Sequence, residues 1–245
     1  MRNIKLTLEY DGTGYHGWQI QPNSSTIQGV LEEKIGIITG QRITLIASGR
    51  TDAGVHALGQ VANFRTESSI PLEALKRGVN SLLPDDIAIK RVDTVSDDFH
   101  ARFSAKSKLY EYRIFNNPVL SPMERNFSWH ISQRLDLSKM QKAAEALLGT
   151  HDFSSFRSAQ TDNLNPVRSM MAVEIKKKKN HIVSFRLRAN AFLKQMVRNI
   201  VGTLVDVGRG KIEPGEFRGI LEARDRTKAG MTAPPNGLFL VEVEY

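Results

Sequence analysis

The chain opens with apolar residues at every second position from 4 to 10, the period of a strand with one buried face. After a polar, Gly-rich loop, apolar residues recur three and four positions apart over 27–38, which predicts an amphipathic helix. Ser25 and Gln28 have the spacing of a capping box at the start of this helix. Gly40 stands where the pattern stops and is expected to end the helix.

Four more elements complete a first half. Two strands are predicted over 43–47 and 58–64, and a third strand is predicted over 87–92. Between the second and third of these, Pro71 is placed to open a helix whose apolar face lies within 72–82. The resulting order is βαββαβ, which is that of a ferredoxin-like unit.

The second half repeats this order. Its predicted elements are a strand over 110–114, a helix over 140–148 ended by Gly149, a hairpin of 170–175 and 182–189, a helix over 193–204, a short inserted helix over 214–223 and a last strand over 238–243. Residues 117–135 show neither period and are expected to cross between the halves. We therefore predict an α+β protein of two ferredoxin-like βαββαβ halves, 1–105 and 106–245, with a central cleft.

Composition narrows the class of protein. Hydrophobic residues make up 40% and charged residues 24% of the 245 positions, which is ordinary for a globular protein. The net charge of +8 favours a polyanionic partner such as nucleic acid, with a basic protein that has no such partner as the alternative. The N-terminus alternates polar and apolar residues, unlike a signal peptide, and no apolar run reaches membrane-spanning length, so we expect a cytoplasmic protein.

Several kinds of chemistry are excluded or unsupported. The absence of cysteine excludes disulfides, cysteine-ligated zinc and a cysteine nucleophile. The chain has no P-loop, HExxH, EF-hand, G-x-S-x-G or aromatic RNP1 motif. Its six histidines are widely separated, and none pairs at the spacing of metal ligands. We expect neither a metal nor a cofactor.

One loop, 47–56, carries a candidate catalytic group. Gly49 and Gly54 flank Arg50 and Asp52, so that the backbone can bend sharply and present both side chains. A neighbouring arginine favours the ionised form of an aspartate, and an ionised carboxylate can act as a nucleophile or a base. The competing interpretation is that Asp52 only forms a turn, as aspartates between glycines commonly do.

Other candidates have two interpretations each. Tyr110 and Tyr112 share one strand face and either fill the core or stack on an RNA base. Arg198 lies in an otherwise apolar helix and either faces solvent or grips a carboxylate or phosphate. Lys176 to Lys179 form a solvated hairpin tip or, as a second interpretation, contact RNA.

Six motifs, spread in order along essentially the whole chain, resemble those of the tRNA pseudouridine synthase A (TruA) family. Their sequences are YDG with YHGWQ (10–19), GRTDAGVH (49–56), DFHARFSA (98–105), YEY (110–112), MVRNIVG (196–202) and TAPPNGL (232–238). The one mild departure is Lys108, where many relatives have arginine.

The resemblance implies a role for each matching residue. Asp52 corresponds to the catalytic aspartate, Tyr110 to the tyrosine that stacks on the target uracil, and Arg198 to the arginine that pairs with the catalytic carboxylate. Arg50 corresponds to a residue that holds the RNA and helps flip the base, and Leu238 to apolar packing near the aspartate. The family acts as a homodimer without a cofactor on uridines 38 to 40 of the tRNA anticodon stem-loop.

Two other functions remain open from the sequence. The first is a catalytically silent RNA-binding protein on the same scaffold, which would not need the carboxylate of Asp52. The second is a glycoside-cleaving enzyme, which would require a second acid near Asp52 that the sequence does not nominate. Which of the neighbouring uridines is preferred does not follow from the sequence.

Overall fold

The computed structural model describes residues 1–158 and 165–245 of the chain. Contacts divide it into two compact units, Met1–Lys106 with Phe239–Tyr245, and Ser107–Leu238. Each unit combines a β-sheet with helices, so the α+β class predicted from the sequence is confirmed. In the described part of the chain, no helix has the length and apolar character needed to cross a membrane.

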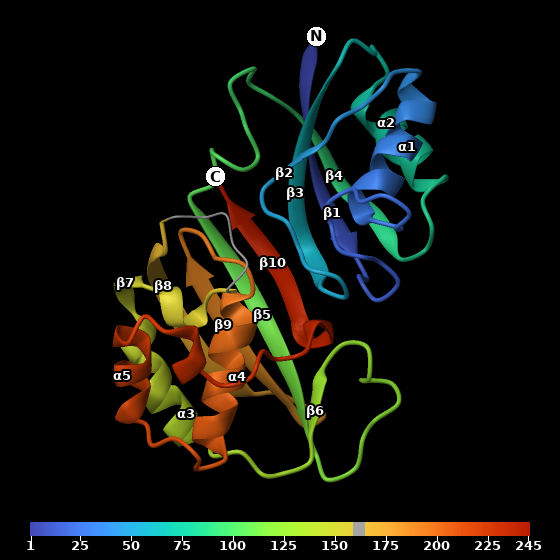
Figure 1. Cartoon of the computed structure of the whole chain (residues 1–245). Coiled ribbons are helices and arrows are strands. Elements are labelled where there is room, and N and C mark those ends of the chain that lie inside the picture. Colours follow the sequence, from blue (N-terminus) through green and yellow to red (C-terminus); the bar gives the residue numbers. More distant parts are fainter. Residues whose placement is uncertain (159–164) are drawn as a thin grey trace. The chain divides into compact units, whose positions relative to one another are not determined.

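The first unit contains one sheet with strand order β4-β1-β3-β10, and β2 also pairs with β3. Its elements are β1 (Arg2–Tyr10), α1 (Ile27–Thr39), β2 (Ile46–Ala47), β3 (His56–Thr66), α2 (Leu72–Asn80), β4 (Ile87–Val95) and β10 (Leu238–Glu244). Strand β1 is antiparallel to both β3 and β4, whereas β10 is parallel to β3. Helices α1 and α2 lie side by side on one face of this sheet (Figure 1).

The last strand was expected in the second half, 106–245, but its contacts group it with the first unit. The reason is its pairing, in which Phe239 and Leu240 of β10 stand opposite His56 and Ala57 of β3. Strand β3 is long enough, at 11 residues, to pair with β1 along one edge and with β2 and β10 at different points of the other. The hydrophobic period of a strand does not indicate which distant strand it pairs with.

The buried face of β1 is the one that its alternation predicts, and α1 buries the expected stripe. The cap of α1 differs from the prediction, because Thr26 rather than Ser25 accepts the hydrogen bond from the Gly29 N–H. Strand β2 is shorter than the predicted 43–47. Its preceding residue Leu45 gives its backbone N–H to the Glu32 carboxylate at 2.8 Å, which removes that group from the ladder.

The second unit is built on a sheet with strand order β5-β9-β8-β7, and β6 pairs in parallel with β5. Its elements are β5 (Ser107–Asn116), β6 (Trp129–Ile131), α3 (Leu137–Ala144), β7 (Gly149–Asp152), β8 (Val167–Lys177), β9 (Ile182–Ala189), α4 (Met196–Gly208) and α5 (Glu216–Glu222). Helices α3, α4 and α5 gather on one side of the sheet (Figure 1).

The predicted hairpin is confirmed as β8 and β9, and α5 is the predicted inserted helix. Strands β6 and β7 were not predicted, because three or four residues are too few to show a period. Helix α4 starts at Met196 rather than at 193, and it is buried on nearly all sides. Such a helix brings polar residues into the interior, and Asn199 and Thr203 are buried, whereas Arg198 is half-buried.

Candidate active site

Asp52 lies in the connection between β2 and β3, at the first position of a tight turn. The Val55 N–H donates to the Asp52 carbonyl at 3.2 Å, and Gly54 holds a φ of 75° at the third position. This is the geometry of a type II turn, whose third position needs a positive φ and therefore favours glycine. The hydrogen bond that closes the turn joins backbone groups, so an aspartate side chain is not required for it.

Buried hydrogen bonds fix the backbone on both sides of Arg50 and Asp52. The Gln60 amide donates to the Gly49 carbonyl at 2.9 Å and accepts from the Ser48 hydroxyl at 2.7 Å. On the other side, the hydroxyls of Tyr10 and Thr51 are 2.9 Å apart. Burial raises the pKa of Tyr10 to about 12, against the opposing hydrogen bonds from Thr51 and Gln60, so the phenol stays neutral. Hydrogen bonds among the buried polar side chains of Tyr10, Ser48, Thr51 and Gln60 therefore hold the loop. The sequence did not indicate this network.

A second loop, within 11–18, supports the turn from its other side. The Trp18 N–H donates to the Thr51 carbonyl at 3.0 Å, and the Gly54 N–H donates to the Tyr15 carbonyl at 3.3 Å. Gly17 has a φ of 87°, and a Cβ at this position would lie 2.6 Å from the Thr51 carbonyl oxygen. The YHGWQ motif that contains Gly17 thus holds the backbone of the Asp52 loop.

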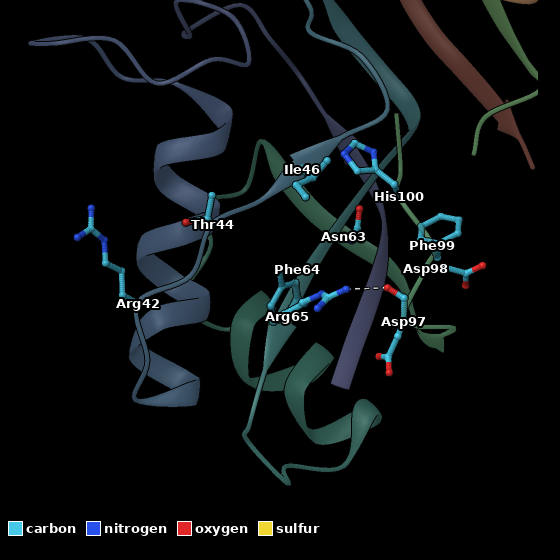
Figure 2. A pocket seen from close by; sticks show the side chains of 10 residues that line it. All are labelled: Arg42, Thr44, Ile46, Asn63, Phe64, Arg65, Asp97, Asp98, Phe99 and His100. Atoms are coloured by element: carbon cyan, nitrogen blue, oxygen red, sulfur yellow. Dashed lines mark hydrogen bonds between the residues drawn. The ribbon is translucent and has the colours of Figure 1, made fainter. Parts of the chain in front are cut away.

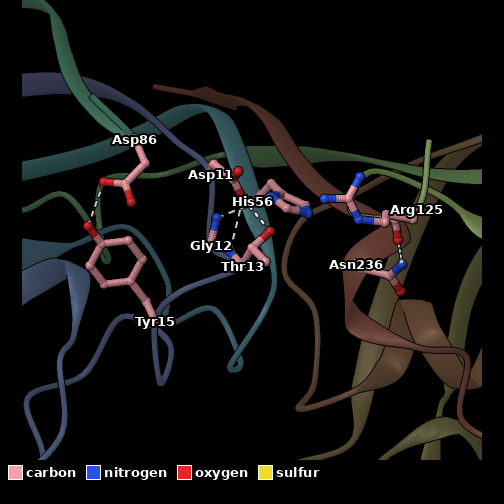
Figure 3. A network of polar contacts seen from close by, with 8 residues as sticks. All are labelled: Asp11, Gly12, Thr13, Tyr15, His56, Asp86, Arg125 and Asn236. Atoms are coloured by element: carbon pink, nitrogen blue, oxygen red, sulfur yellow. Dashed lines mark hydrogen bonds and ion pairs between the residues drawn. The ribbon is translucent and has the colours of Figure 1, made fainter. Parts of the chain in front are cut away.

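Polar contacts at the start of β3 tie the same two loops together (Figure 3). The Gly12 N–H donates to His56 Nδ1 at 3.1 Å, and Asp11 Oδ1 lies 3.1 Å from the same nitrogen. The His56 ring also stacks on Phe239 of β10, with ring centroids 4.7 Å apart. Because His56 is only 1% exposed, it fixes the end of the Asp52 loop from inside the unit.

Tyr15 anchors the outer part of the second loop. Its hydroxyl donates to the Asp86 carboxylate at 2.5 Å, as Figure 3 shows. Burial, together with this hydrogen bond and the negative charges of Asp86 and Asp11, raises the pKa of Tyr15. The first unit therefore presents a half-buried Asp52 and an exposed Arg50 on a loop whose backbone is held at many points.

Tyr110 and Tyr112 lie on β5 of the second unit, with their side chains on the same face. The Tyr110 ring is 7% exposed and meets the Phe192 ring edge-on, with centroids 5.0 Å apart at 80°. Tyr112 is fully buried, and its hydroxyl donates to the Pro234 carbonyl at 2.8 Å. Burial raises the pKa of Tyr112, although the positive charge of Arg198 opposes the effect.

Arg198 lies in the first turn of α4 and is bound within the fold rather than facing solvent. Its Nε donates to the Ala233 carbonyl at 2.7 Å, and the Ala233 N–H donates to the Arg198 carbonyl at 3.1 Å. Adjacent carbonyls, those of Ala233 and Pro234, thus hold Arg198 and Tyr112. A segment 35 positions along the chain thus binds Arg198, whose side chain is half-buried.

Asn199, the next residue of α4, is a fully buried polar group that sequence reasoning missed. Its amide oxygen accepts from the Thr232 hydroxyl at 2.7 Å and from Arg226 at 3.2 Å, and its amide nitrogen donates to the Phe156 carbonyl at 2.8 Å. The only signal in the sequence was the position of Asn199 within the MVRNIVG motif. The contacts fix the segment that carries Ala233 and Pro234, and with it the guanidinium of Arg198.

The five candidate residues are divided between the two units. Asp52 and Arg50 belong to the first, whereas Tyr110, Arg198 and Leu238 belong to the second. Leu238 is 7% exposed, and its N–H binds the Pro235 carbonyl at the end of the segment that holds Arg198. Within residues 1–158 and 165–245 there is no cluster of three or more acidic or histidine side chains that could hold a metal ion.

Comparison with known proteins defines the family. The profile of the family described as tRNA pseudouridine synthase matches residues 7–104 and 143–245. A tRNA pseudouridine synthase A of Thermoanaerobacter sp. (strain X514) is 49% identical over 245 residues, which is 100% of both chains. One of Acetivibrio thermocellus is 50% identical over the same length, again 100% of both. The chain belongs to the tRNA pseudouridine synthase family.

Solved structures similar to this tRNA pseudouridine synthase family member include distant ones. A chain in the crystal structure of an archaeal box H/ACA ribonucleoprotein complex has 10% sequence identity and a TM-score of 0.41. The match covers 97% of the present chain and 48% of that chain. The family membership rests on the sequence relatives, and the site rests on the contacts described above.

The central residue of the YEY motif, Glu111, is the buried acid of a cluster of charged side chains. Glu111 alternates with Tyr110 and Tyr112 and so lies on the opposite face of the strand, yet it is only 5% exposed. Its carboxylate accepts hydrogen bonds from Lys178, from the Ser184 hydroxyl at 2.5 Å and from Arg113 at 3.0 Å. Burial by itself raises the pKa of Glu111, but these donors outweigh it and hold the pKa at about 2, below the ordinary 4.5.

Glu111→Gln is expected to lower the free energy of unfolding by about 3 kcal/mol at pH 7, because the hydrogen-bonded charge of the buried carboxylate is lost. A depressed pKa gives stability that is present above pH 4.5 and is lost as the pH falls from there toward 2. The wild-type protein should thus lose more stability than the variant between pH 6 and pH 3. Urea denaturation at both pH values measures this difference.

Glu174→Gln is the matched control, since Glu174 pairs with Lys176 at the surface and its side chain is 43% exposed. Exposed pairs contribute roughly 0–1 kcal/mol, so this variant should unfold nearly as the wild type does. Equal stabilities of wild type and Glu111→Gln at pH 7 would show that the cluster contributes nothing.

Proposed function

We propose that this protein isomerises uridine to pseudouridine in tRNA, with Asp52 as the catalytic residue. The observation that carries the proposal is identity of 49–50% over the full length with relatives named tRNA pseudouridine synthase A. The rigid Asp52 loop adds support, because a catalytic carboxylate must be held in place. A purely RNA-binding protein would not need such a carboxylate.

The reaction moves the glycosidic bond of the target nucleotide. The uridine leaves its stack, the C1′–N1 bond breaks, the uracil turns, and a C1′–C5 bond forms while the C5 proton is lost and N1 gains a proton. Asp52 assists the cleavage by attacking the sugar, attacking the ring or removing a sugar proton. Each of these routes uses the ionised carboxylate and none of them requires a metal or redox cofactor.

The second unit supplies the other groups. Tyr110 stacks on the uracil and keeps it in place while it turns. Arg198 pairs with the Asp52 carboxylate and keeps it oriented. Arg50 holds the RNA and helps to flip the base, and Leu238 packs near the aspartate. Support for the role of Arg198 comes from its anchored Nε, which fixes where the guanidinium points.

Each of the two halves is ferredoxin-like. The first unit supports this, since its order β1-α1-β2-β3-α2-β4 and its strand order β4-β1-β3-β2 are those of a ferredoxin-like unit. The second unit has the same strand-helix-strand-strand-helix core with the short strands β6 and β7 added. The enzyme is cytoplasmic, acts as a homodimer, and modifies uridines 38 to 40 of the anticodon stem-loop.

The test is to incubate unmodified tRNA with the purified protein, digest it to nucleosides and map the modified positions. Pseudouridine at positions 38 to 40 is the expected product. Intact uridine with tRNA still bound would indicate the catalytically silent RNA-binding protein. Abasic sites with released uracil would indicate the glycoside-cleaving enzyme. Either result would overturn the proposal.

Tyr110→Ala should lower turnover by roughly 10- to 100-fold, because a lost base stack costs about 1–3 kcal/mol. Its effect on tRNA affinity should be smaller, because the base stacks on Tyr110 only after it has flipped. Tyr110→Phe should keep most of the activity, since the ring remains. Single-turnover rates and tRNA binding curves separate the two effects. If Phe is as poor as Ala, the hydroxyl has a chemical role that stacking does not explain.

A further inference from the structure

The motif DFHARFSA, residues 98–105, displays an aromatic side chain that the residues discussed so far leave without a role. Phe103 is 76% exposed. One side of its ring contacts the His100 ring, with centroids 4.3 Å apart at 34°, and the Arg102 guanidinium lies 5.5 Å from its centroid. An exposed aromatic ring flanked by a guanidinium and an imidazole is a surface on which a nucleobase can stack.

The turn that carries Phe103 is closed by its own hydrogen bonds. The Ser104 N–H donates to the His100 carbonyl at 2.9 Å. His100 Nδ1 accepts from the N–H groups of Arg102 and Phe103 at 3.2 and 3.3 Å. These bonds fix the imidazole against the Phe103 ring, so the two aromatic groups form one preorganised surface.

Buried residues of the first unit hold the same turn from below. Ala101 is fully buried, and its N–H donates to the Asn63 side chain at 2.9 Å. Its carbonyl accepts from the Tyr245 hydroxyl at 2.8 Å. The exposure of Phe103 is therefore a property of a rigid turn, since its neighbour two positions back is a fixed part of the core.

A cavity of about 480 Å³ adjoins this turn, and His100 belongs to both. Figure 2 shows His100 beside Ile46 and Asn63, with Arg65 reaching toward Asp97. Arg65 donates to the Asp97 carbonyl at 2.7 Å, and Arg42 also lines the cavity. Asp97 and Asp98 line it as well, so the lining residues carry both signs of charge.

The geometry points to the triad of His100, Arg102 and Phe103 as a stacking platform for an unpaired base of the tRNA substrate. The assignment rests on the proposed function, which supplies the tRNA. A base, with its two π faces, suits the exposed Phe103 ring, while Arg102 adds a cation beside it for the adjoining phosphate. The nearby acidic residues Asp97 and Asp98 repel a phosphate from the cavity. We therefore place the base, and not the phosphate, on the Phe103 ring.

The same features argue against a protein partner as the occupant. Protein interfaces have apolar centres from which acidic residues are depleted. The cavity next to Phe103 is instead lined by two aspartates, Asp97 and Asp98. The net charge of +8 on the chain also favours an anionic polymer.

The experiment compares three substitutions at one position. Phe103→Ala is expected to weaken tRNA binding about tenfold, since a base–aromatic stack contributes roughly 1–3 kcal/mol. Phe103→Leu keeps apolar bulk but has no π face and should bind as weakly as Ala. Phe103→Trp should bind as the wild type does, and the emission of this new indole should be quenched when tRNA is added. Fluorescence anisotropy with labelled tRNA gives the affinities.

Ile37→Ala is the matched control, because Ile37 is an exposed apolar residue of the same unit at 61% and lies on α1, away from the motif. It should leave tRNA affinity unchanged. The platform is overturned if Phe103→Ala or Phe103→Leu binds tRNA as tightly as wild type. It is also overturned if Phe103→Ala only converts a dimer to a monomer in sedimentation, which would make a second copy of the chain the occupant.

The outcome is separate from that of the proposed function. A wild-type protein that makes no pseudouridine refutes the proposed activity, whatever Phe103 does. A wild-type protein that makes pseudouridine, with a Phe103→Ala variant of unchanged affinity, refutes only the platform.

Discussion

Asp52→Asn is expected to abolish pseudouridine formation, with a loss of roughly 10⁴-fold or more in turnover, while tRNA still binds. Asparagine has nearly the shape of aspartate but cannot supply a carboxylate, so the chemical step fails. The fold should survive, because the turn is closed by the backbone groups of Asp52 and Val55. Affinity should survive as well, because phosphate contacts dominate nucleic-acid affinity and a carboxylate does not attract a phosphate.

The measurement has three parts that must be read together. Circular dichroism and thermal unfolding establish the fold of the variant, anisotropy gives its tRNA affinity, and nucleoside analysis gives its product. Asp85→Asn, at an exposed loop position next to Asp86, is the matched control and should keep full activity. Ample pseudouridine from folded Asp52→Asn would remove Asp52 from the chemistry. Loss of fold together with binding would leave Asp52 as a turn-forming residue.

Arg198→Ala is the second substitution with a large expected effect, a fall in turnover of about 100-fold in a protein that still folds. A charge-assisted hydrogen bond contributes about 1.5–3 kcal/mol, and this variant removes the partner proposed for the Asp52 carboxylate. It also removes the bond from Nε to the Ala233 carbonyl, so some loss of thermal stability is expected. The helix itself should persist, because its other faces are buried among apolar residues.

Arg198→Lys distinguishes charge from geometry. Lysine keeps the positive charge but has no planar fork with which to bind the Ala233 carbonyl and a carboxylate at once. We expect it to restore only a minor part of the activity. Arg218→Ala, on the exposed side of α5, controls for the loss of a surface charge. Wild-type turnover of a folded Arg198→Ala variant would mean that Arg198 only stabilises the segment around Ala233.

Much of this protein could be predicted from neighbours in the sequence. The alternation over 4–10 and the stripe over 27–38 identified β1 and α1, because each period depends on residues a few positions apart. The turn at Asp52 follows from Gly54, which adopts the positive φ that the turn requires. The net charge, the absence of cysteine and the family motifs are likewise properties of the sequence alone.

Tertiary structure decided what depends on distant partners. Nothing near Leu45 in the sequence indicates that Glu32 takes its N–H and shortens β2. Glu111 follows an alternation that would leave it exposed, yet Lys178 and Ser184 come from 67 and 73 positions away to surround it. The sequence therefore determined the local elements and the Asp52 loop. The chain's folding decided which polar groups are buried and how Arg198 is held, because hydrogen-bond partners across a sheet or a helix face are chosen by packing and not by sequence distance.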